Sequence, residues 1–167
     1  VQVQGKALFH RALEAVPAEQ FDRTVVVSQY PEVLELAHRM GFVPVPNRHP
    51  DWGISHTISL GLGKLPEMDA ALFQVADQPL LRRETVEAMT ERFCHEQTSP
   101  AEWQKETERE IFRLGAVADN DPTPLVGSPV LFGSSFFPEL LTLPENKGGN
   151  VLLKKYPAQV RTICIAD

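Results

Sequence analysis

The sequence predicts an α/β protein of three layers, in which helices cover both faces of a mainly parallel sheet. Short apolar runs rich in β-branched residues alternate with longer segments whose apolar residues recur at helical spacing. This repeated alternation is typical of βαβ units, which build parallel sheets. The chain has 167 residues, of which 43% are hydrophobic, and this is enough for one full core. We therefore expect residues 1–167 to form a single domain.

The first part of the chain alternates helix and strand up to a central apolar run. Pro17 ends the first helical pattern, and Gly41 follows the second at the position where a left-handed residue commonly ends a helix. Pro44 lies in the second strand pattern and indicates a strand near the edge of the sheet. We expect helices over residues 8–16 and 33–40, a buried strand over 23–28 and a short strand over 42–45.

The central apolar run, residues 70–75, is typical of a buried strand in a parallel sheet. A buried strand does not tolerate a charge in its middle, so we expect Asp77 just past the carboxyl end of the strand. Pro79 cannot continue the ladder and holds Gln78 extended. Open α/β sheets bind their ligands at the carboxyl ends of strands, which makes Asp77 the first candidate site residue.

The later part of the chain resumes the alternation after an irregular segment. Residues 102–110 are dense in charge, which is typical of a solvated helix face. Residues 118–124 combine aspartates and prolines and are expected to form a loop. The remaining elements are expected as helices over 86–93, 136–141 and 151–156 and as strands over 127–132 and 160–165.

Composition argues against two classes of partner. A net charge of −6 and a pI near 5.4 leave no basic stripe for a nucleic acid backbone. No apolar run approaches the roughly 20 residues that a membrane span needs, and no signal-peptide pattern is present, so we expect a cytoplasmic protein. Cys94 and Cys164 lie far apart without metal-site spacing, which favours reduced core residues.

Asp77 has two chemical interpretations. A carboxylate held at a strand end can bind a hard cation such as Mg²⁺ beside substrate phosphates. The alternative is that Asp77 only caps the helix expected to begin near Arg82.

A second candidate loop, residues 53–62, has glycine, Ser55, His56 and Thr57 ahead of a helix. Free N–H groups at a helix N-terminus, together with hydroxyl donors, favour phosphate or a polar base. An ordinary serine N-cap is the alternative for the hydroxyls, and a surface hydrogen-bond donor is the alternative for His56.

Two further loops carry weaker signals. Gly127 and Pro129 flank Ser128 ahead of a strand, where small residues allow backbone to approach a bound ring, although this is also ordinary turn chemistry. Lys147 lies among small and polar residues and can meet a phosphate, or it can be an exposed lysine on a turn.

These motifs, in this order, resemble the MobA-like nucleotidyltransferase family, which includes molybdenum cofactor cytidylyltransferases and guanylyltransferases. The resemblance covers most of the chain and implies a Rossmann-like fold of the nucleotide-diphospho-sugar transferase type. The matching segments are residues 5–8 with G-K-P-L, residues 47–62 with N-P-D-W-x-x-G-[ML]-S-S-S-L-x-x-G-L, residues 76–81 with A-D-Q-P-L, residues 127–132 with G-x-P-V-L-F and residues 146–149 with D-x-G-[AG].

The resemblance implies nucleotidyl transfer. The terminal phosphate of molybdopterin would attack the α-phosphorus of an NTP, with CTP ahead of GTP, and pyrophosphate would leave with the help of Mg²⁺. Asp77 would be catalytic and a metal ligand, with Asn146 as a second metal ligand. Nucleotide binding would involve Asn47, Gly53, Ser55, His56 and Thr57, and acceptor binding would involve Gly127, Ser128, Pro129, Asn146 and Lys147.

The sequence departs from the family pattern in three places. The family begins with a strand and a glycine-rich loop of the type L-A-A-G-x-S-x-R-M-G-x-x-K, which this sequence lacks and which we expect ahead of Val1. His56 and Thr57 stand where the family has two serines. Asn146 stands where the closest relatives carry an Asp, so its amide oxygen brings no charge to a metal.

Three functions are compatible with this pattern. The first is transfer of CMP, or less readily GMP, to the molybdenum cofactor. The second keeps the transfer but uses another phosphorylated acceptor, such as a sugar phosphate. The third is a non-catalytic module that holds cofactor for a molybdenum hydroxylase apoenzyme; Asn146 and the absent loop favour it, whereas Asp77 opposes it.

Overall fold

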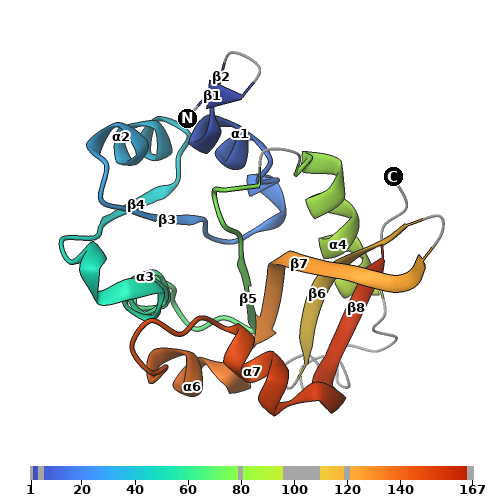
Figure 1. The fold of residues 1–167 in the computed structure, drawn as a ribbon. Helices are drawn as coiled ribbons and strands as arrows, with labels where there is room; N and C mark the ends of the chain where they lie inside the picture. The colour runs from blue at the N-terminus through green and yellow to red at the C-terminus, as the bar shows by residue number, and fades with distance from the viewer. Residues whose placement is uncertain (1, 4–5, 79–80, 96–109, 119–120, 165–167) are drawn as a thin grey trace.

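The computed structural model describes residues 2–3, 6–78, 81–95, 110–118 and 121–164, which form an α/β fold (Figure 1). The strands are β1 (Gln2–Val3), β2 (Lys6–Ala7), β3 (Val25–Ser28), β4 (Val43–Pro46), β5 (Ala70–Phe73), β6 (Ile111–Ala118), β7 (Asp121–Gly133) and β8 (Val160–Cys164). The helices are α1 (Leu8–Glu14), α2 (Pro31–Arg39), α3 (Gly53–Leu62), α4 (Arg83–His95), α6 (Phe137–Leu141) and α7 (Asn150–Lys155). Short 3₁₀ turns are η1 (Ala18–Gln20), η2 (Pro50–Trp52), η3 (Ser134–Phe136) and η4 (Pro157–Gln159).

The N-terminal part of the fold is the parallel pair β3–β4 with a helix layer on each face. Val26 packs with α1 and α2 around a core that includes Leu13 and Ala37. Val27 points to the opposite face of the pleat, where a Cβ added to Gly61 of α3 would lie 3.4 Å from it. The expected strand is therefore present, but its four residues are half-buried rather than buried.

The second sheet has the strand order β5–β7–β6–β8. Neighbouring residues of each strand face opposite helix layers, as the pleat requires. Ile111 and Phe132 face the core formed with α3, α6 and α7, whereas Phe112 and Leu131 face Met89 and other residues of α4. The helix α4 therefore covers one face of this sheet, and α3, α6 and α7 cover the other, which confirms the expected sheet flanked by helices (Figure 1).

The second sheet is mixed, because β7 runs antiparallel to both of its neighbours. Parallel pairing is found between β3 and β4 and between β6 and β8. The strands β6 and β7 are joined through residues 119–120, and a connection this short permits only antiparallel pairing. The expected mainly parallel arrangement did not anticipate this hairpin.

Two expectations for the later part of the chain are corrected. Residues 121–124 were expected in a loop, but they belong to β7, whose pairing with β6 extends to Asp121 opposite Ala118. The strand β6 was not anticipated at all. Most of the charge-dense segment 102–110 lies outside the described residues. Pairing along the hairpin overrides the turn tendency of Asp121 and the two prolines that follow, because strand preference depends on context.

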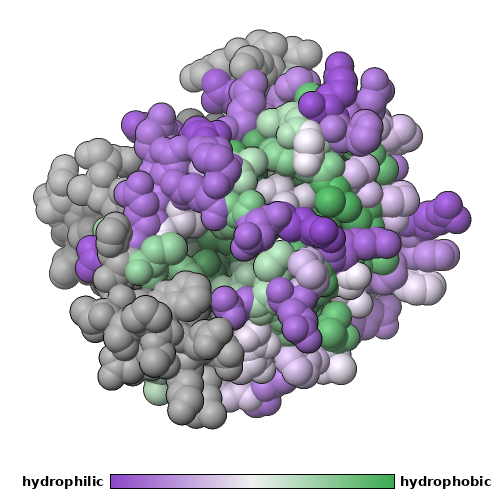
Figure 2. Space-filling model, turned by 180° about the vertical axis from the view of Figure 1, so that it is seen from behind, coloured by the Kyte–Doolittle hydropathy of each residue, from purple (hydrophilic) through white to green (hydrophobic). Residues whose placement is uncertain are grey.

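The surface mixes hydrophobic and hydrophilic residues, and Figure 2 shows hydrophobic residues exposed between hydrophilic ones on the face seen from behind. Among the described helices, none has the length and apolar character required to cross a membrane. Cys94 and Cys164 are free thiols, as expected, but both are exposed and so are not core residues.

Candidate functional site

The segment that enters α3 is organised by Asn47, which follows β4 and is 7% exposed. The Asn47 side-chain oxygen accepts from the backbone N–H of His49 at 3.0 Å, and its Nδ2 donates to Thr57 Oγ1 at 3.2 Å. Asn47 thus links the end of a strand to the first turns of the next helix. Of the residues assigned to nucleotide binding, Asn47 and Thr57 bond to each other.

The helix α3 begins at Gly53, and no side chain caps its N-terminus. The alternative of an ordinary serine cap therefore does not describe this helix, because Ser55 lies inside its first turn. Gly53 has a φ of +78°, which favours glycine. A Cβ at Gly53 would lie 2.0 Å from the side-chain oxygen of Asn146, so only glycine allows this approach.

The loop of residues 145–149 lies against the start of α3 through small residues. Asn146 adopts the left-handed conformation, with a φ of +59°. A Cβ at Gly148 would meet Ile54 of α3 at 3.7 Å, and one at Gly149 would meet the Phe132 ring at 2.7 Å. The structure therefore brings together Gly53 and Asn146, which had been assigned to different substrates, while Lys147 remains exposed.

The side chains of α3 divide between two faces. Thr57 turns towards Asn47, and Ile58 packs into the core beside the second sheet. Ser55 and His56 lie on the other face, where they line a pocket together with Trp52. The three adjacent residues Ser55, His56 and Thr57 therefore do not act as one binding loop, because helical spacing separates Thr57 from the other two.

The candidate catalytic residue, Asp77, is exposed in a turn that follows β5. Residues 78–82 separate Asp77 from α4, so it does not cap that helix, and the alternative of a simple cap does not apply. The residues around Asp77 are held from two sides. Gln74 Nε2 donates to the carbonyl of Ala12 in α1 at 2.7 Å, and Gln78 Nε2 donates to the carbonyl of Ser128 at 2.9 Å.

Ser128 joins the Asp77 turn to β7. Its hydroxyl donates to the Phe73 carbonyl at 3.4 Å and accepts from the backbone N–H of Val75 at 3.4 Å. A Cβ at Gly127 would lie 3.7 Å from Gln78 Nε2, and the bond between Ser128 and Pro129 is a cis peptide, with Pro129 buried. The residues assigned to the acceptor therefore divide, with Gly127 to Pro129 beside Asp77 and Asn146 beside α3.

Two amide oxygens in this region lack a partner. Within the described part of the chain, the Oε1 atoms of Gln74 and Gln78 are buried without a hydrogen bond. Each amide nitrogen faces a backbone carbonyl, which can only accept, so the oxygen must be the free atom. Sequence reasoning treated both glutamines only as neighbours of Asp77, and no signal in the sequence marks them.

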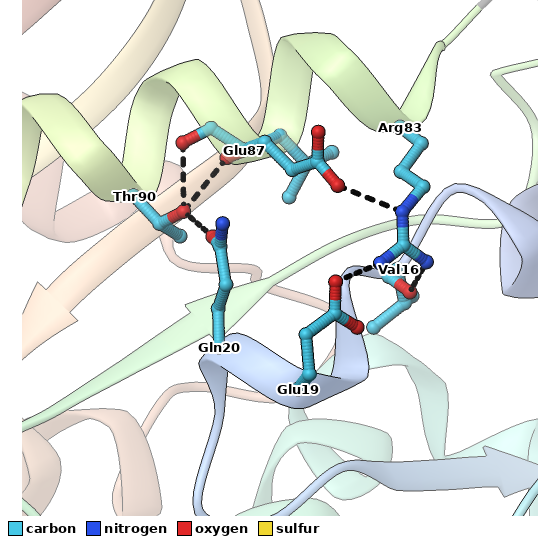
Figure 3. Close-up of polar contacts among 7 residues, drawn as sticks. Val16, Glu19, Gln20, Arg83, Glu87 and Thr90 are labelled. Atoms are coloured by element: carbon cyan, nitrogen blue, oxygen red, sulfur yellow. Dashed lines mark hydrogen bonds and ion pairs between the residues drawn. The ribbon is translucent and has the colours of Figure 1, made fainter.

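The helix that follows the Asp77 turn is tied to η1 by a polar network (Figure 3). Arg83 Nη1 donates to the Val16 carbonyl at 3.2 Å, and the same guanidinium bonds to Glu19 and to Glu87. Thr90 donates to the side chain of Gln20.

The pKa of Glu19 lies below its ordinary value because of the hydrogen bond from Arg83. The turn is therefore supported at both ends by the α1–η1 segment.

The donor set suits a cation held jointly with a ligand. No group of three or more His, Cys, Asp or Glu side chains is arranged for a metal among the described residues. Mg²⁺ commonly takes one or two carboxylates and completes its shell with water and substrate phosphates. Asp77 is one exposed carboxylate after a strand, which is the kind of ligand that such a site uses.

The pattern of the whole chain agrees with one family of proteins. The family model described as the MobA-like NTP transferase domain matches residues 1–160. The chain belongs to this family. Membership of the MobA-like NTP transferase family supports nucleotidyltransferase activity and an NTP as one substrate.

Solved structures share the fold of this MobA-like chain. A nucleotidyl transferase from Methanothermobacter is 19% identical with a TM-score of 0.69, covering 99% of this chain and 72% of its own. The manganese complex of Rv0371c from Mycobacterium tuberculosis H37Rv is 19% identical with a TM-score of 0.65, covering 100% and 80%. A CMP:2-keto-3-deoxy-manno-octonic acid synthetase complexed with CTP is 14% identical with a TM-score of 0.65, covering 100% and 82%. At these identities the likeness concerns the fold.

Proposed function

We propose that the protein transfers a nucleoside monophosphate from an NTP to the phosphate of a molybdopterin-type cofactor, with CTP preferred over GTP. The observation that carries the proposal is the placement of Asp77. Its carboxylate is exposed past the end of β5, in a turn held on one side by Ala12 and on the other by Ser128. Such support leaves the carboxylate free while limiting the motion of the backbone that presents it.

A divalent cation fits this donor set. Asp77 would hold Mg²⁺ together with the substrate phosphates, and Asn146 would offer an amide oxygen from the loop beside α3. When bound, Mg²⁺ supplies charge neutralisation at the phosphate oxygens. The likeness of fold to a manganese complex is consistent with a divalent cation, although it identifies none of the ligands here.

The chemistry asks little of the protein beyond alignment. The acceptor phosphate oxygen bonds to the α-phosphorus of the NTP as the bond to the bridging oxygen breaks, and pyrophosphate leaves. A phosphate is already ionised near neutral pH, so no strong general base is required. Positioning and electrostatic stabilisation carry most of the rate enhancement in such transfers. Ser128 in β7, beside the Asp77 turn, and the Asn146 loop, beside α3, would position the acceptor.

The nucleotide would lie near the start of α3. The backbone N–H groups of the first turn, beginning at Gly53, have no side-chain cap and are suited to phosphate oxygens. Asn47 would act mainly by holding Thr57 and the entry to α3, because its own side chain is already bonded. The preference for CTP is supported by the resemblance of residues 76–81 and 127–132 to the motifs of the cytidylyltransferases. A complex with CTP among the proteins of similar fold supports it as well.

An alternative acceptor is supported by one comparison. The synthetase of similar fold is named for a sugar acid, so this architecture accommodates acceptors other than a pterin. Asn146, in turn, is the feature that favours a non-catalytic module serving a molybdenum hydroxylase apoenzyme, because an amide adds no charge to a metal site. Retention of Asp77 in a supported turn favours catalysis over that role.

Replacement of Asp77 tests the proposal directly. In the full-length protein, Asp77→Ala should reduce pyrophosphate release from CTP and acceptor by about 100-fold or more, the range seen when one strong electrostatic contact is removed. The fold should persist, because the side chain is exposed. The matched control is Asp69→Ala, an exposed Asp ahead of the same strand. Normal turnover by the Asp77 variant would remove this residue from the mechanism.

A further inference from the structure

The outward face of α3 forms a pocket that the proposed transfer does not yet explain. Trp52, Ser55, His56 and Ser59 recur at the spacing of one helical face, and they line a cavity of about 420 Å³. The opposite wall comes from Leu141 at the end of α6 and from Glu145 in the segment that follows. The pocket is a groove that is widely open to solvent, and its volume is within the roughly 300–1,000 Å³ common for small-molecule sites.

The indole of Trp52 is held in place by two neighbouring rings. The His49 ring stacks on it with centroids 4.2 Å apart and planes 12° apart. The His56 ring meets it at 4.8 Å and 63°, edge to face. Trp52 nevertheless remains 50% exposed, and Leu141 across the pocket remains 49% exposed. Trp52 and Leu141 therefore give the pocket a half-exposed apolar lining suited to a flat ligand.

The polar groups of the pocket are open. Within the described part of the chain, no hydrogen bond engages the side chains of Ser55, Ser59 or Glu145. A carboxylate only accepts, and its two oxygens match two parallel N–H donors, as in pairing with a guanidinium. A 2-amino-4-oxopyrimidine edge presents such a pair, formed by a ring N–H and the adjacent amino group. Guanine and pterin rings have this edge, whereas neutral cytosine does not.

The pocket is linked to the proposed reaction site by chain connectivity. Glu145 is followed directly by Asn146, whose side-chain oxygen lies against Gly53 at the start of α3. The pocket therefore adjoins the start of α3, where the proposed transfer places the nucleotide phosphates.

We propose that this pocket binds the ring of the phosphorylated substrate that carries a 2-amino-4-oxopyrimidine edge, with Glu145 as the reader of that edge and Trp52 as the stacking surface. The inference rests on the proposed transfer, in which that substrate is the pterin acceptor. The nucleotide base would then lie elsewhere, and the pocket would reject cytosine.

Binding of a free pterin tests this assignment without turnover. We would titrate 6-hydroxymethylpterin into the full-length protein and follow the fluorescence anisotropy of the pterin, with GTP and CTP as competitors. Trp52→Ala should weaken binding by about 10- to 100-fold, since stacking on an aromatic residue is worth about 1–3 kcal/mol per base. Glu145→Gln should weaken it by about tenfold or more, as expected for a hydrogen bond to a charged group.

The controls match each variant in chemistry. Tyr30→Ala removes an aromatic residue of similar exposure outside the pocket, and Glu67→Gln neutralises an exposed carboxylate outside it. Both should leave pterin binding unchanged. Trp52→Phe should restore part of the affinity, which a merely structural defect would not do.

The outcomes separate this inference from the proposed transfer. Competition by GTP but not by CTP would support recognition of the shared ring edge. Binding of GTP without binding of pterin would assign the pocket to the donor base and overturn its assignment to the acceptor. Pterin binding that is absent, or that is unaffected by Trp52→Ala and Glu145→Gln, would overturn the pocket assignment. Turnover of CTP that persists in that case would leave the proposed transfer intact.

Discussion

The two sides of the candidate site are built by different means. The Asp77 turn is held by polar side chains, with Gln74 bonded to α1 and Gln78 bonded to Ser128. The 145–149 loop instead lies against α3 and β7 at Gly53 and Gly149, where a side chain would clash. The Asp77 turn therefore depends on polar side chains that form hydrogen bonds, whereas the 145–149 loop depends on glycines that have no side chain. We expect substitutions in the Asp77 turn to lower the free energy of unfolding only slightly, and substitutions of the tightly packed glycines to lower it strongly.

The largest effect on stability is expected at Gly53. Gly53→Ala should destabilise the protein by roughly 2–6 kcal/mol, because a non-glycine residue at its φ of +78° and ψ of −171° costs about 1–3 kcal/mol and overpacking costs about 1–3 kcal/mol. Gly41→Ala is the control for a positive φ without a close contact, since its φ is +79° but no atom lies within 4 Å of the added Cβ. Urea midpoints of the two variants measure the difference. Equal destabilisation would mean that the contact with Asn146 has no energetic role.

A somewhat smaller effect is expected at Gly149. Gly149→Ala should cost about 1–3 kcal/mol, because the new methyl would overlap the buried Phe132 ring, with the nearest atom 2.7 Å away. Gly148→Ala should be close to neutral, since its nearest contact would be an ordinary 3.7 Å. Thermal unfolding of both variants gives the comparison. A Gly148 variant that is as unstable as the Gly149 variant would contradict this account of the loop.

The polar side of the site should respond more weakly. Gln78→Met should change the free energy of unfolding by about 1 kcal/mol or less, because it removes a hydrogen bond to Ser128 and also an unpaired buried oxygen. Amide exchange at Val75 and Asp77 should nevertheless become faster, as the turn loses its tie to β7. The exposed Gln159, replaced in the same way, serves as control. Unchanged exchange would show that Gln78 does not hold the turn.

The smallest effect is expected from pH. Hydrogen bonds from Arg83 lower the pKa of Glu19 beside the Asp77 turn, and hydrogen bonds from Lys155 and Tyr156 lower the pKa of Glu139 in α6. A carboxyl whose pKa is lowered on folding stabilises the protein above its ordinary value of 4.5, and that stabilisation is lost as the pH falls through the lowered pKa.

Wild type should therefore lose slightly more stability on acidification than Glu19→Gln or Glu139→Gln, as measured by urea midpoints on either side of pH 4.5. Both pairs are exposed, so the difference should be small and should decrease in high salt. A variant that loses as much stability as wild type would show that its ion pair contributes nothing.

The sequence was most informative where local chemistry decides the structure. The spacing of apolar residues identified α1, α2 and α4, and Gly41 marked the end of α2 with a φ of +79°. An apolar run followed by a charge placed Asp77 beyond a strand. The hairpin of β6 and β7 was missed because its strands are stabilised by each other across the sheet, and turn-forming residues at 121–124 obscured the start of β7.

The candidate site could be predicted only in part. Asp77 and Asn146 lie in exposed turns, as the sequence predicted, whereas Ser128 lies within β7 and is half-buried. Their partners could not be read from the sequence, because the contact of Gly53 with Asn146 and the bond of Gln74 to Ala12 join segments distant along the chain. Helical geometry likewise separated Thr57 from Ser55, although the two lie in one motif.

The central claim is that Asp77 and a divalent cation together bind the nucleotide. The most direct test is calorimetric titration of the full-length protein with CTP and with GTP, each with and without Mg²⁺, for wild type and Asp77→Ala. The account predicts binding that requires Mg²⁺, favours CTP and loses its Mg²⁺ dependence in the variant. Folded wild type that binds neither nucleotide, or that binds equally with and without Mg²⁺ and with or without Asp77, would contradict it.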